Sequence, residues 1–267
     1  MADLVPLLII CGPTAAGKTD LAVRLAEDDA YEVVSADSRQ VYRLMDIGTA
    51  KPSPEEQERV RHHLIDVVWP NEEYHASLFA EQAKQVIQEI RARDSRPLLV
   101  GGTGLYIRAL TEGLIQAPGA DPAVRRRLNR RADEEGGEVL HERLQEVDPQ
   151  TAERLHPNDR VRVIRALEVF EQTGRPLSAF HAEHRFADRP YRTLKLGLMV
   201  ERDLLYRRID QRAEKMFANG LFEETEALLN AGYDPDLKSL RTIGYRQAVQ
   251  VLAGRCSRED ALEDLQR

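Results

Sequence analysis

A glycine-rich segment near the N-terminus constrains the fold of this chain more than any other feature. Residues 12–19 read GPTAAGKT and match the phosphate-binding pattern G-x-x-x-x-G-K-[ST] at every fixed position. The segment follows a continuous apolar run at 7–10 and precedes a helical pattern at 21–26. Such a run is typical of a parallel strand that is covered on both faces. The sequence therefore predicts a strand, a phosphate-binding loop and a helix in succession.

The chemistry of this loop favours a diphosphate or triphosphate ligand. Gly12 and Gly17 let the backbone wrap around a phosphate, so that successive N–H groups point inward. A helix that begins near Lys18 adds the positive end of its dipole, and the Lys18 ammonium group adds a full charge. The Thr19 hydroxyl is a candidate ligand for Mg²⁺, the expected cofactor. The predicted phosphate-binding residues of the loop are Gly12, Thr14, Ala15, Ala16, Gly17, Lys18 and Thr19.

The loop alone does not identify the phosphate compound. A GTPase is expected to carry an N-K-x-D base-reading motif, and the sequence contains none. An ATPase usually has an apolar strand that ends in an acidic residue. The nearest candidate is Leu64-Ile65-Asp66, but apolar residues continue past it through Val68. ATP and GTP are the usual ligands of such a loop, but no second motif in this sequence supports either of them.

Further apolar runs indicate that the loop belongs to an α/β sheet. Short strands are predicted at 33–34, 64–68, 98–100 and 194–200. Apolar residues at helical spacing over 76–93 predict a helix before the third of these strands. Strands separated by helices predict a parallel sheet, here a P-loop NTPase-like core.

The strand signal disappears from about Gly113 and returns only at Leu194. Amphipathic helix patterns fill the interval, as over 161–170. A strand after a helical block suggests that the sheet is interrupted by an insertion. We therefore predict an inserted all-helical domain at 113–192 within an α/β core formed by 1–112 and 193–267.

The charge of the chain argues at first against a nucleic-acid partner. The 267 residues carry 45 acidic and 38 basic side chains, a net charge of −7, whereas nucleic-acid phosphates attract Lys and Arg. The deficit lies outside the block at 113–192, because that block holds 14 Arg, no Lys and 14 acidic residues. The total charge is therefore a weak guide to the surface of any one region.

Neither a membrane nor an oxidising compartment is indicated. The longest apolar run, at 4–11, is too short to span a bilayer, and it lacks the basic flank and cleavage site of a signal peptide. The two cysteines, Cys11 and Cys256, form no CxxC pair. We expect a cytoplasmic monomer without a membrane partner.

Two polar segments are predicted to share one edge of the sheet with the phosphate loop. Asp37 follows the strand at 33–34, and a GGTG sequence at 101–104 follows the strand at 98–100. Residues just past the carboxyl ends of parallel strands share one crevice. There Asp37 could accept a proton or hold Mg²⁺ through water, or it could simply cap a following helix. Position alone weighs these roles equally.

Six motifs in a fixed order make the chain resemble a known family. They are the phosphate loop, Asp37–Tyr42, Asp46–Pro52, Gly101–Tyr106, His156–Asp159 with Arg165–Glu168, and Ile243–Arg246. Together they resemble the tRNA dimethylallyltransferases, also called isopentenyl-tRNA transferases, over essentially the whole chain. The fold of that family is a P-loop α/β core with an inserted helical domain, which agrees with the division predicted above.

The resemblance implies a prenyl transfer. Enzymes of this family move a dimethylallyl group from its pyrophosphate to the exocyclic N6 of the adenine on the 3′ side of the anticodon in tRNA, and they release pyrophosphate. It implies catalytic roles for Asp37 as general base, for Thr103 in contact with substrate and for Lys18 at the leaving group. It also implies that Arg208 and Arg212 bind pyrophosphate, without ranking one above the other.

An adenine in a stacked anticodon loop must be extruded to reach such a channel. By motif position, the resemblance implies tRNA contacts at Asp37, Ser38, Arg39, Gln40, Thr103, Arg162, Arg165, Arg241, Gly244, Tyr245 and Arg246. Arg126, in the basic run at 125–131, is a further candidate contact. Without the resemblance, Arg162 and Arg165 would be interpreted as a solvated helix face with i,i+3 spacing. The basic run at 125–131 is equally consistent with RNA contact and with an exposed helix paired with nearby acids.

Two other functions compete with this interpretation. A small-molecule or nucleotide kinase would explain the loop, Asp37 and the arginines of the insertion, but not the motifs at 46–52 and 156–168. A nucleotide-driven switch or adaptor needs a sensor element, and we identify none in the sequence. Family members usually continue beyond the position of Arg267 with a basic helix that grips the anticodon stem. We therefore expect the chain as given to keep the pyrophosphate site and to bind tRNA weakly.

Overall fold

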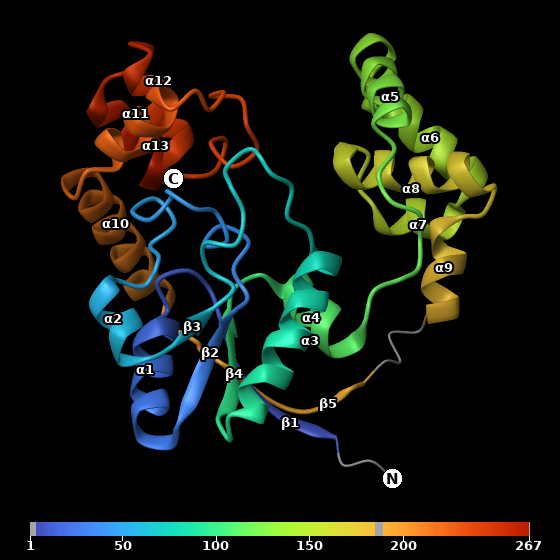
Figure 1. The fold of residues 1–267 in the computed structure, drawn as a ribbon. Coiled ribbons are helices and arrows are strands. Elements are labelled where there is room, and N and C mark those ends of the chain that lie inside the picture. The colour runs from blue at the N-terminus through green and yellow to red at the C-terminus, as the bar shows by residue number, and fades with distance from the viewer. Residues whose placement is uncertain (1–3, 185–188, 267) are drawn as a thin grey trace. The chain divides into compact units, whose positions relative to one another are not determined.

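Parallel strands form the centre of the structure, a computed structural model that describes residues 4–184 and 189–266 (Figure 1). Among these residues, one five-stranded sheet has the order β3-β2-β4-β1-β5. The strands are β1 (Val5–Cys11), β2 (Tyr31–Ser35), β3 (His62–His63), β4 (Arg96–Gly101) and β5 (Tyr191–Gly197). Every paired neighbour runs parallel, so the carboxyl ends of the strands meet at one edge. The predicted P-loop-like α/β fold is confirmed.

The apolar runs of the sequence fill the middle of this sheet. In β4, all residues from Pro97 to Gly101 are buried, which is expected for a strand covered on both faces. Helices α1 (Lys18–Asp29) and α3 (Ala76–Ala92) both contact β2 and β4. The edge strand β5 differs, because all its residues after Tyr191 are exposed.

The strand predicted at 64–68 is not formed. The backbone turns instead, with positive φ angles of 61° at Leu64 and 53° at Asp66, and only an isolated bridge joins Val68 to Tyr42. The strand of this region, β3, lies just before it and has two residues. Apolar composition alone did not reveal that the backbone leaves the extended conformation here.

The remaining helices of the α/β unit either precede residue 113 in the chain or come after β5. Helix α2 has a capping box in which Ser53 accepts from the Glu56 N–H and the Glu56 side chain accepts from the Ser53 N–H. The bounds are α2 (Pro54–Arg59), α4 (Gly104–Glu112), α10 (Arg202–Ala218), α11 (Leu221–Asn230), α12 (Tyr245–Leu252) and α13 (Arg258–Gln266). Helix α10 carries predicted pyrophosphate residues, and α12 begins within the motif at 243–246.

The helical part of the chain has a core of its own. It consists of α5 (Pro122–Glu135), α6 (Gly137–Val147), α7 (Pro149–Arg154), α8 (Arg160–Thr173) and α9 (Leu177–His184). Leu128, Leu144 and Val163 are among the buried residues of one apolar cluster in this part. The fully buried Glu168 carboxylate accepts from Arg125, Arg165 and the Asp121 N–H, so its charge is neutralised within the same helices.

The contacts between Cα atoms divide the chain into two compact units. One unit comprises Met1–Thr111 and Arg189–Arg267, and the other comprises Glu112–Asp188. The sequence-based insertion at 113–192 overlaps the second unit, but β5 already begins at Tyr191. Within the described residues, no helix combines the length and the apolarity that crossing a membrane requires.

One close approach between backbones gives a test of this packing. A Cβ atom added to Gly101 at the end of β4 would lie 2.1 Å from the Ala36 carbonyl oxygen, so a side chain there must push two backbones apart. We expect Gly101→Ala to lower the free energy of unfolding by about 1–3 kcal/mol in urea titrations. The matched control is Gly197→Ala at the end of β5, where a Cβ atom would meet nothing within 4 Å. Equal stability losses in both variants would contradict this account.

Candidate functional site

The phosphate loop joins β1 to α1 in a conformation that leaves the helix N-terminus open. Gly17 precedes α1 with φ 87°, a left-handed conformation, and no side chain caps the first N–H groups of this helix. The other glycine of the pattern, Gly12, is close to β5, because a Cβ atom there would lie 3.0 Å from the Leu198 carbonyl oxygen. Uncapped N–H groups and the helix dipole make this N-terminus suitable for an anion.

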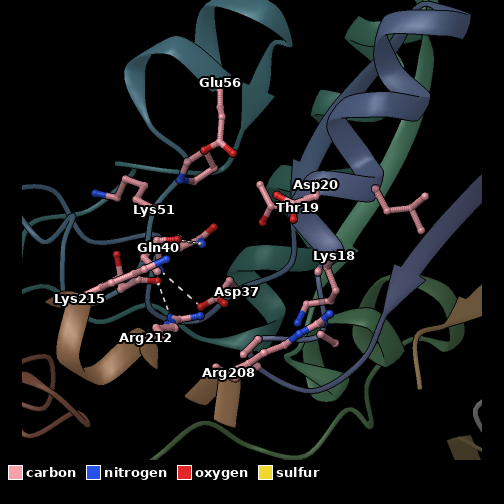
Figure 2. A pocket seen from close by; sticks show the side chains of 18 of the residues that line it. Lys18, Thr19, Asp20, Asp37, Gln40, Lys51, Glu56, Arg208, Arg212 and Lys215 are labelled. Carbon is pink, nitrogen blue, oxygen red and sulfur yellow. Dashed lines mark hydrogen bonds between the residues drawn. The ribbon is translucent and has the colours of Figure 1, made fainter. Parts of the chain in front are cut away.

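Lys18 lies in the interior of the loop (Figure 2). Its ammonium group donates to the carbonyl oxygens of Gly12 at 3.0 Å and Pro13 at 2.7 Å. Burial lowers the pKa of Lys18, and the nearby Asp37 carboxylate opposes this effect. An anionic ligand in the loop would favour the charged form of this group.

The segments after β2 and β4 meet beside the loop, as the sequence predicts. The Thr103 N–H donates to the Ala36 carbonyl at 3.2 Å, and the Ser38 N–H donates to the Thr103 hydroxyl at 3.0 Å. An Asp37 carboxylate oxygen accepts from the Arg39 N–H at 2.8 Å, which fixes its orientation. Asp37 and Thr103 are thus held by the same short stretch of backbone.

A pocket of 810 Å³ contains most of the predicted phosphate residues. Its lining includes Thr14, Ala15, Ala16, Gly17, Lys18, Thr19, Asp37, Gln40, Arg208 and Arg212. Figure 2 shows cationic side chains from α10 and from the loop around the same space. The structure therefore brings Thr14–Thr19, Asp37 and both α10 arginines to one hollow, and Gly12 is not among the residues that line it.

The two arginines of α10 differ in their surroundings. Arg208 is exposed, while Arg212 is half-buried and donates to the Thr49 carbonyl at 3.5 Å. Burial lowers the pKa of Arg212, and the Asp37 carboxylate acts in the opposite direction. Because a desolvated cation gains more from an anionic ligand than an exposed one, Arg212 is the stronger candidate.

A second hollow of 380 Å³ adjoins the first and is more apolar. Both are lined by Thr14, Asp37, Thr49 and Arg212. The second also contains Ile209, Ala213, Met216, Ile243 and Leu265, together with Arg39. Asp37 therefore stands where a cationic, phosphate-suited space meets an apolar one.

Two residues predicted to contact tRNA lie in the interior instead. Tyr245 is fully buried, and the Gly244 backbone is buried beside it. A buried side chain cannot touch RNA in this conformation, so the structure does not support a direct contact for either residue. Their exposed neighbours Arg241 and Arg246 line a separate groove of 570 Å³ and pair with Asp236 and Asp264.

The predicted tRNA residues of the helical unit have mixed surroundings. Arg126 is exposed on α5. Arg162 is 73% exposed and pairs with Asp159 in its own helix turn, as the solvated-face interpretation predicts. Arg165 donates to the buried Glu168 and to the Pro118 carbonyl. Arg165 thus stabilises its own unit, and a side chain in that position has limited freedom to reach RNA.

Three cationic residues that line the large pocket were not predicted from the sequence: Arg24, Lys51 and Lys215. Lys215 follows Arg208 and Arg212 at spacings that place all three on one face of α10, so helical periodicity contained the signal. Lys51 belongs to the motif at 46–52, whose sequence alone indicates no role for it. Its ammonium group pairs with Asp46 and Asp66, and its side chain is only 3% exposed.

The donor set of the pocket bears on the expected Mg²⁺. Among the described residues, no group of three His, Cys, Asp or Glu side chains could hold a metal ion by itself. Mg²⁺ commonly uses one or two protein oxygens and completes its shell with phosphate oxygens and water. The Thr19 hydroxyl, which lines the pocket, fits that mode and not a closed protein site.

Comparison with known proteins agrees with this geometry. The model of the IPP transferase family matches residues 40–267. The chain belongs to this family. A "tRNA dimethylallyltransferase" of Geobacter sulfurreducens is 59% identical over 98% of this chain and 84% of its own length. A "tRNA dimethylallyltransferase 2" of Geotalea uraniireducens is 55% identical over 99% of this chain and 86% of its own length.

Solved structures of the family share the fold. The full-length tRNA isopentenylpyrophosphate transferase of Bacillus halodurans has a TM-score of 0.69 and 40% identity, over 98% of this chain and 82% of its own. A eukaryotic dimethylallyltransferase acting on tRNA has a TM-score of 0.81 and 28% identity, over 98% of this chain and 66% of its own. The resemblance inferred from six motifs is confirmed at the level of the family.

The different burial of the α10 arginines yields a prediction for pyrophosphate binding. We expect Arg212→Ala to raise the Kd for pyrophosphate by about tenfold or more, because a desolvated charge-assisted contact is lost. Arg208→Ala should have a smaller effect, since its guanidinium group remains hydrated. Isothermal titration calorimetry in the presence of Mg²⁺ measures both. Arg207→Ala, an exposed neighbour outside the pocket lining, is the control. A larger loss for Arg208→Ala than for Arg212→Ala would contradict this ranking.

Proposed function

We propose that this chain transfers a dimethylallyl group from dimethylallyl pyrophosphate to the exocyclic N6 of the adenine on the 3′ side of the anticodon in tRNA, with release of pyrophosphate. The observation that carries the proposal is the position of Asp37. It lines both the cationic hollow at the phosphate loop and the apolar hollow beside it. A donor with an anionic end and an apolar end, attacked by an amine that must lose a proton, suits this arrangement.

The cationic end suits the leaving group. As the bond between C1 of the dimethylallyl group and oxygen stretches, negative charge grows on the pyrophosphate. The N–H groups of the loop, Lys18 and Arg212 can neutralise that charge. Mg²⁺ held by the Thr19 hydroxyl and by phosphate oxygens would add a further positive charge to the same group. The allylic C1 favours departure, because positive charge on it is delocalised.

The acceptor needs a base. The lone pair of the adenine N6 is conjugated with the ring, so N6 becomes a better nucleophile as its proton is removed. In the proposed step, a bond forms between N6 and C1, the bond between C1 and oxygen breaks, and Asp37 accepts the N6 proton. The Arg39 N–H and the Thr103 hydroxyl hold the backbone and carboxylate around Asp37 in place.

The partner of this site is proposed to be a tRNA anticodon stem-loop. Support comes from family membership and from the eukaryotic relative, whose structure shows it acting on tRNA. The target adenine must leave its stack to reach Asp37. Candidate contacts are the exposed Arg39, Arg241 and Arg246 in the α/β unit and Arg126 and Arg162 in the helical unit. We expect the enzyme to act as a cytoplasmic monomer.

A single incubation tests the activity. The protein is mixed with Mg²⁺, an unmodified anticodon stem-loop RNA and dimethylallyl pyrophosphate, and the mass of the RNA is followed. We expect a gain of one dimethylallyl group and release of pyrophosphate. An unchanged RNA mass together with ATP-dependent phosphorylation of a small metabolite would favour the kinase interpretation instead.

The role of Asp37 is tested by removing its carboxylate. We expect Asp37→Ala to lower kcat by about 10²–10⁴-fold, the usual contribution of a general base. The Kd for the RNA should change little, because the surrounding arginines remain. Quenched-flow turnover and fluorescence anisotropy with labelled RNA measure the two quantities. Turnover at the wild-type rate would show that Asp37 is not the base.

A further inference from the structure

The motif at 46–52 forms a loop whose role the proposed reaction does not explain. Its residues Gly48 and Thr49 line the apolar hollow, and Thr49, Ala50 and Lys51 line the phosphate pocket. The loop forms no regular helix or strand. Turn hydrogen bonds within the loop, such as that from the Lys51 N–H to the Asp46 carbonyl at 3.1 Å, define part of its shape, and contacts from elsewhere in the chain hold it in place.

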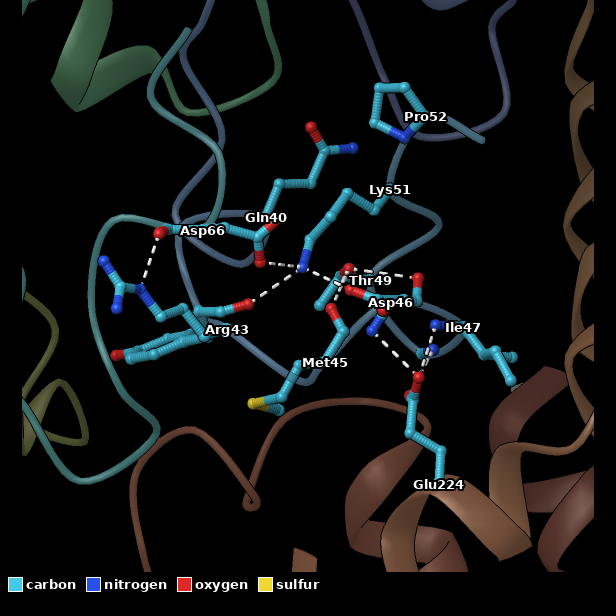
Figure 3. Close-up of polar contacts among 12 residues, drawn as sticks. Gln40, Arg43, Met45, Asp46, Ile47, Thr49, Lys51, Pro52, Asp66 and Glu224 are labelled. Carbon is cyan, nitrogen blue, oxygen red and sulfur yellow. Dashed lines mark hydrogen bonds and ion pairs between the residues drawn. The ribbon is translucent and has the colours of Figure 1, made fainter. Parts of the chain in front are cut away.

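One carboxylate on α11 holds the start of this loop (Figure 3). An oxygen of Glu224 accepts from the Asp46 N–H at 2.9 Å and the Ile47 N–H at 3.0 Å. The second oxygen accepts from the Gly48 N–H at 3.3 Å. Three successive N–H groups directed at one anion form a backbone nest, and here a side chain of the protein occupies it.

The same carboxylate also binds the motif at 243–246. The Tyr245 hydroxyl donates to the Glu224 oxygen that accepts from Gly48. The Tyr245 ring packs directly on Gly48, where an added Cβ atom would lie 2.3 Å from a ring carbon. Burial, with the adjacent Glu224 carboxylate, raises the pKa of Tyr245, so the hydroxyl keeps its proton and remains a donor. Tyr245 is thus buried between Gly48, against which its ring packs, and Glu224, which binds its hydroxyl.

A second anchor holds the far end of the loop. The Lys51 ammonium group donates to Asp46 at 2.5 Å, to Asp66 at 2.6 Å and to the Tyr42 carbonyl at 2.9 Å. Figure 3 shows the Lys51 and Glu224 contacts on either side of the loop backbone. The loop is thus held at residues 46–48 by Glu224 and at residue 51 by the contacts of the Lys51 ammonium group.

The carbonyl oxygens between these anchors point at residues of the site. The Thr49 carbonyl accepts from Arg212 at 3.5 Å, and the Ala50 carbonyl accepts from the Gln40 amide at 3.1 Å. A shift of the loop would therefore move the partner of the half-buried arginine assigned to pyrophosphate. Small displacements of such a group change ligand binding strongly.

We propose that Glu224 is a positioning residue of the active site, which holds residues 46–48 so that the Thr49 carbonyl orients Arg212 toward pyrophosphate. Glu224 lines neither hollow and does not touch the reacting atoms. The inference rests on the proposed function only in so far as Arg212 binds the pyrophosphate end of the donor.

The test compares Glu224→Gln with Glu223→Gln, its exposed neighbour on α11. Both variants lose one negative charge, but only the first replaces an acceptor oxygen with an NH₂ group that faces N–H donors. We expect Glu224→Gln to raise the Kd for pyrophosphate, measured by calorimetry with Mg²⁺, by about tenfold, and Glu223→Gln to leave it unchanged. In turnover assays, the KM for dimethylallyl pyrophosphate should rise more than kcat falls. Amide hydrogen exchange at 46–48 should accelerate only in Glu224→Gln.

A purely structural role would give a different pattern. Glu224→Gln would then lower the unfolding temperature and the active fraction but leave the Kd for pyrophosphate at the wild-type value, and that result would overturn the inference. If Glu224→Gln does not fold, Tyr245→Phe decides, because it removes one donor to the carboxylate. We expect its Kd to rise about threefold, and an unchanged Kd overturns the inference.

The direct binding measurement separates this inference from the proposed function. It uses pyrophosphate alone, so the role of Glu224 can be judged even if the wild-type protein transfers no prenyl group to RNA. A wild-type protein that binds no pyrophosphate would overturn the inference, because Arg212 would then have no such ligand to meet.

Discussion

The site depends on a close approach between two backbones at the carboxyl edge of the sheet. The Ala36 N–H donates to the Val100 carbonyl at 2.7 Å, and the Ala36 carbonyl accepts from the Thr103 N–H at 3.2 Å. Gly101 permits this approach, because any side chain would strike Ala36. As a result, Asp37 and Thr103, which follow different strands, are fixed beside the loop from β1. The general rule that ligands bind at this edge of a parallel sheet here has a specific structural cause.

Electrostatics then divide the space at this edge. Positive groups from the loop and from α10 gather where the pocket is polar, and burial disfavours the charged forms of Lys18 and Arg212 there. An anionic ligand relieves that cost by compensating both charges. Beyond Asp37 the lining becomes apolar. A prenyl pyrophosphate, with one highly charged end and one hydrocarbon end, matches this division.

The net charge of −7 shows how a total can mislead about partners. The positive charge is unevenly distributed. Arg165 and Arg162 are paired with Glu168 and Asp159, whereas several cations gather in the lining of the phosphate pocket. Arginines with similar sequence signals thus differ in what they can contact. Only the three-dimensional structure distinguishes Arg165, committed to a buried carboxylate, from the exposed Arg126.

The sequence by itself determined the phosphate loop, the parallel sheet and the family, because apolar periodicity and glycine spacing are local properties of the chain. It also placed Asp37 and Thr103 at one edge, since parallel strands end together. It was wrong about a strand at 64–68, where positive φ angles at Leu64 and Asp66 turn the backbone. Only the tertiary structure decided the burial of Tyr245 and the hydrogen bonds between Glu224 and residues 46–48. These contacts join distant segments of the chain, since Asp46 and Glu224 are 178 residues apart. No local pattern records which carboxylate will meet a distant row of N–H groups.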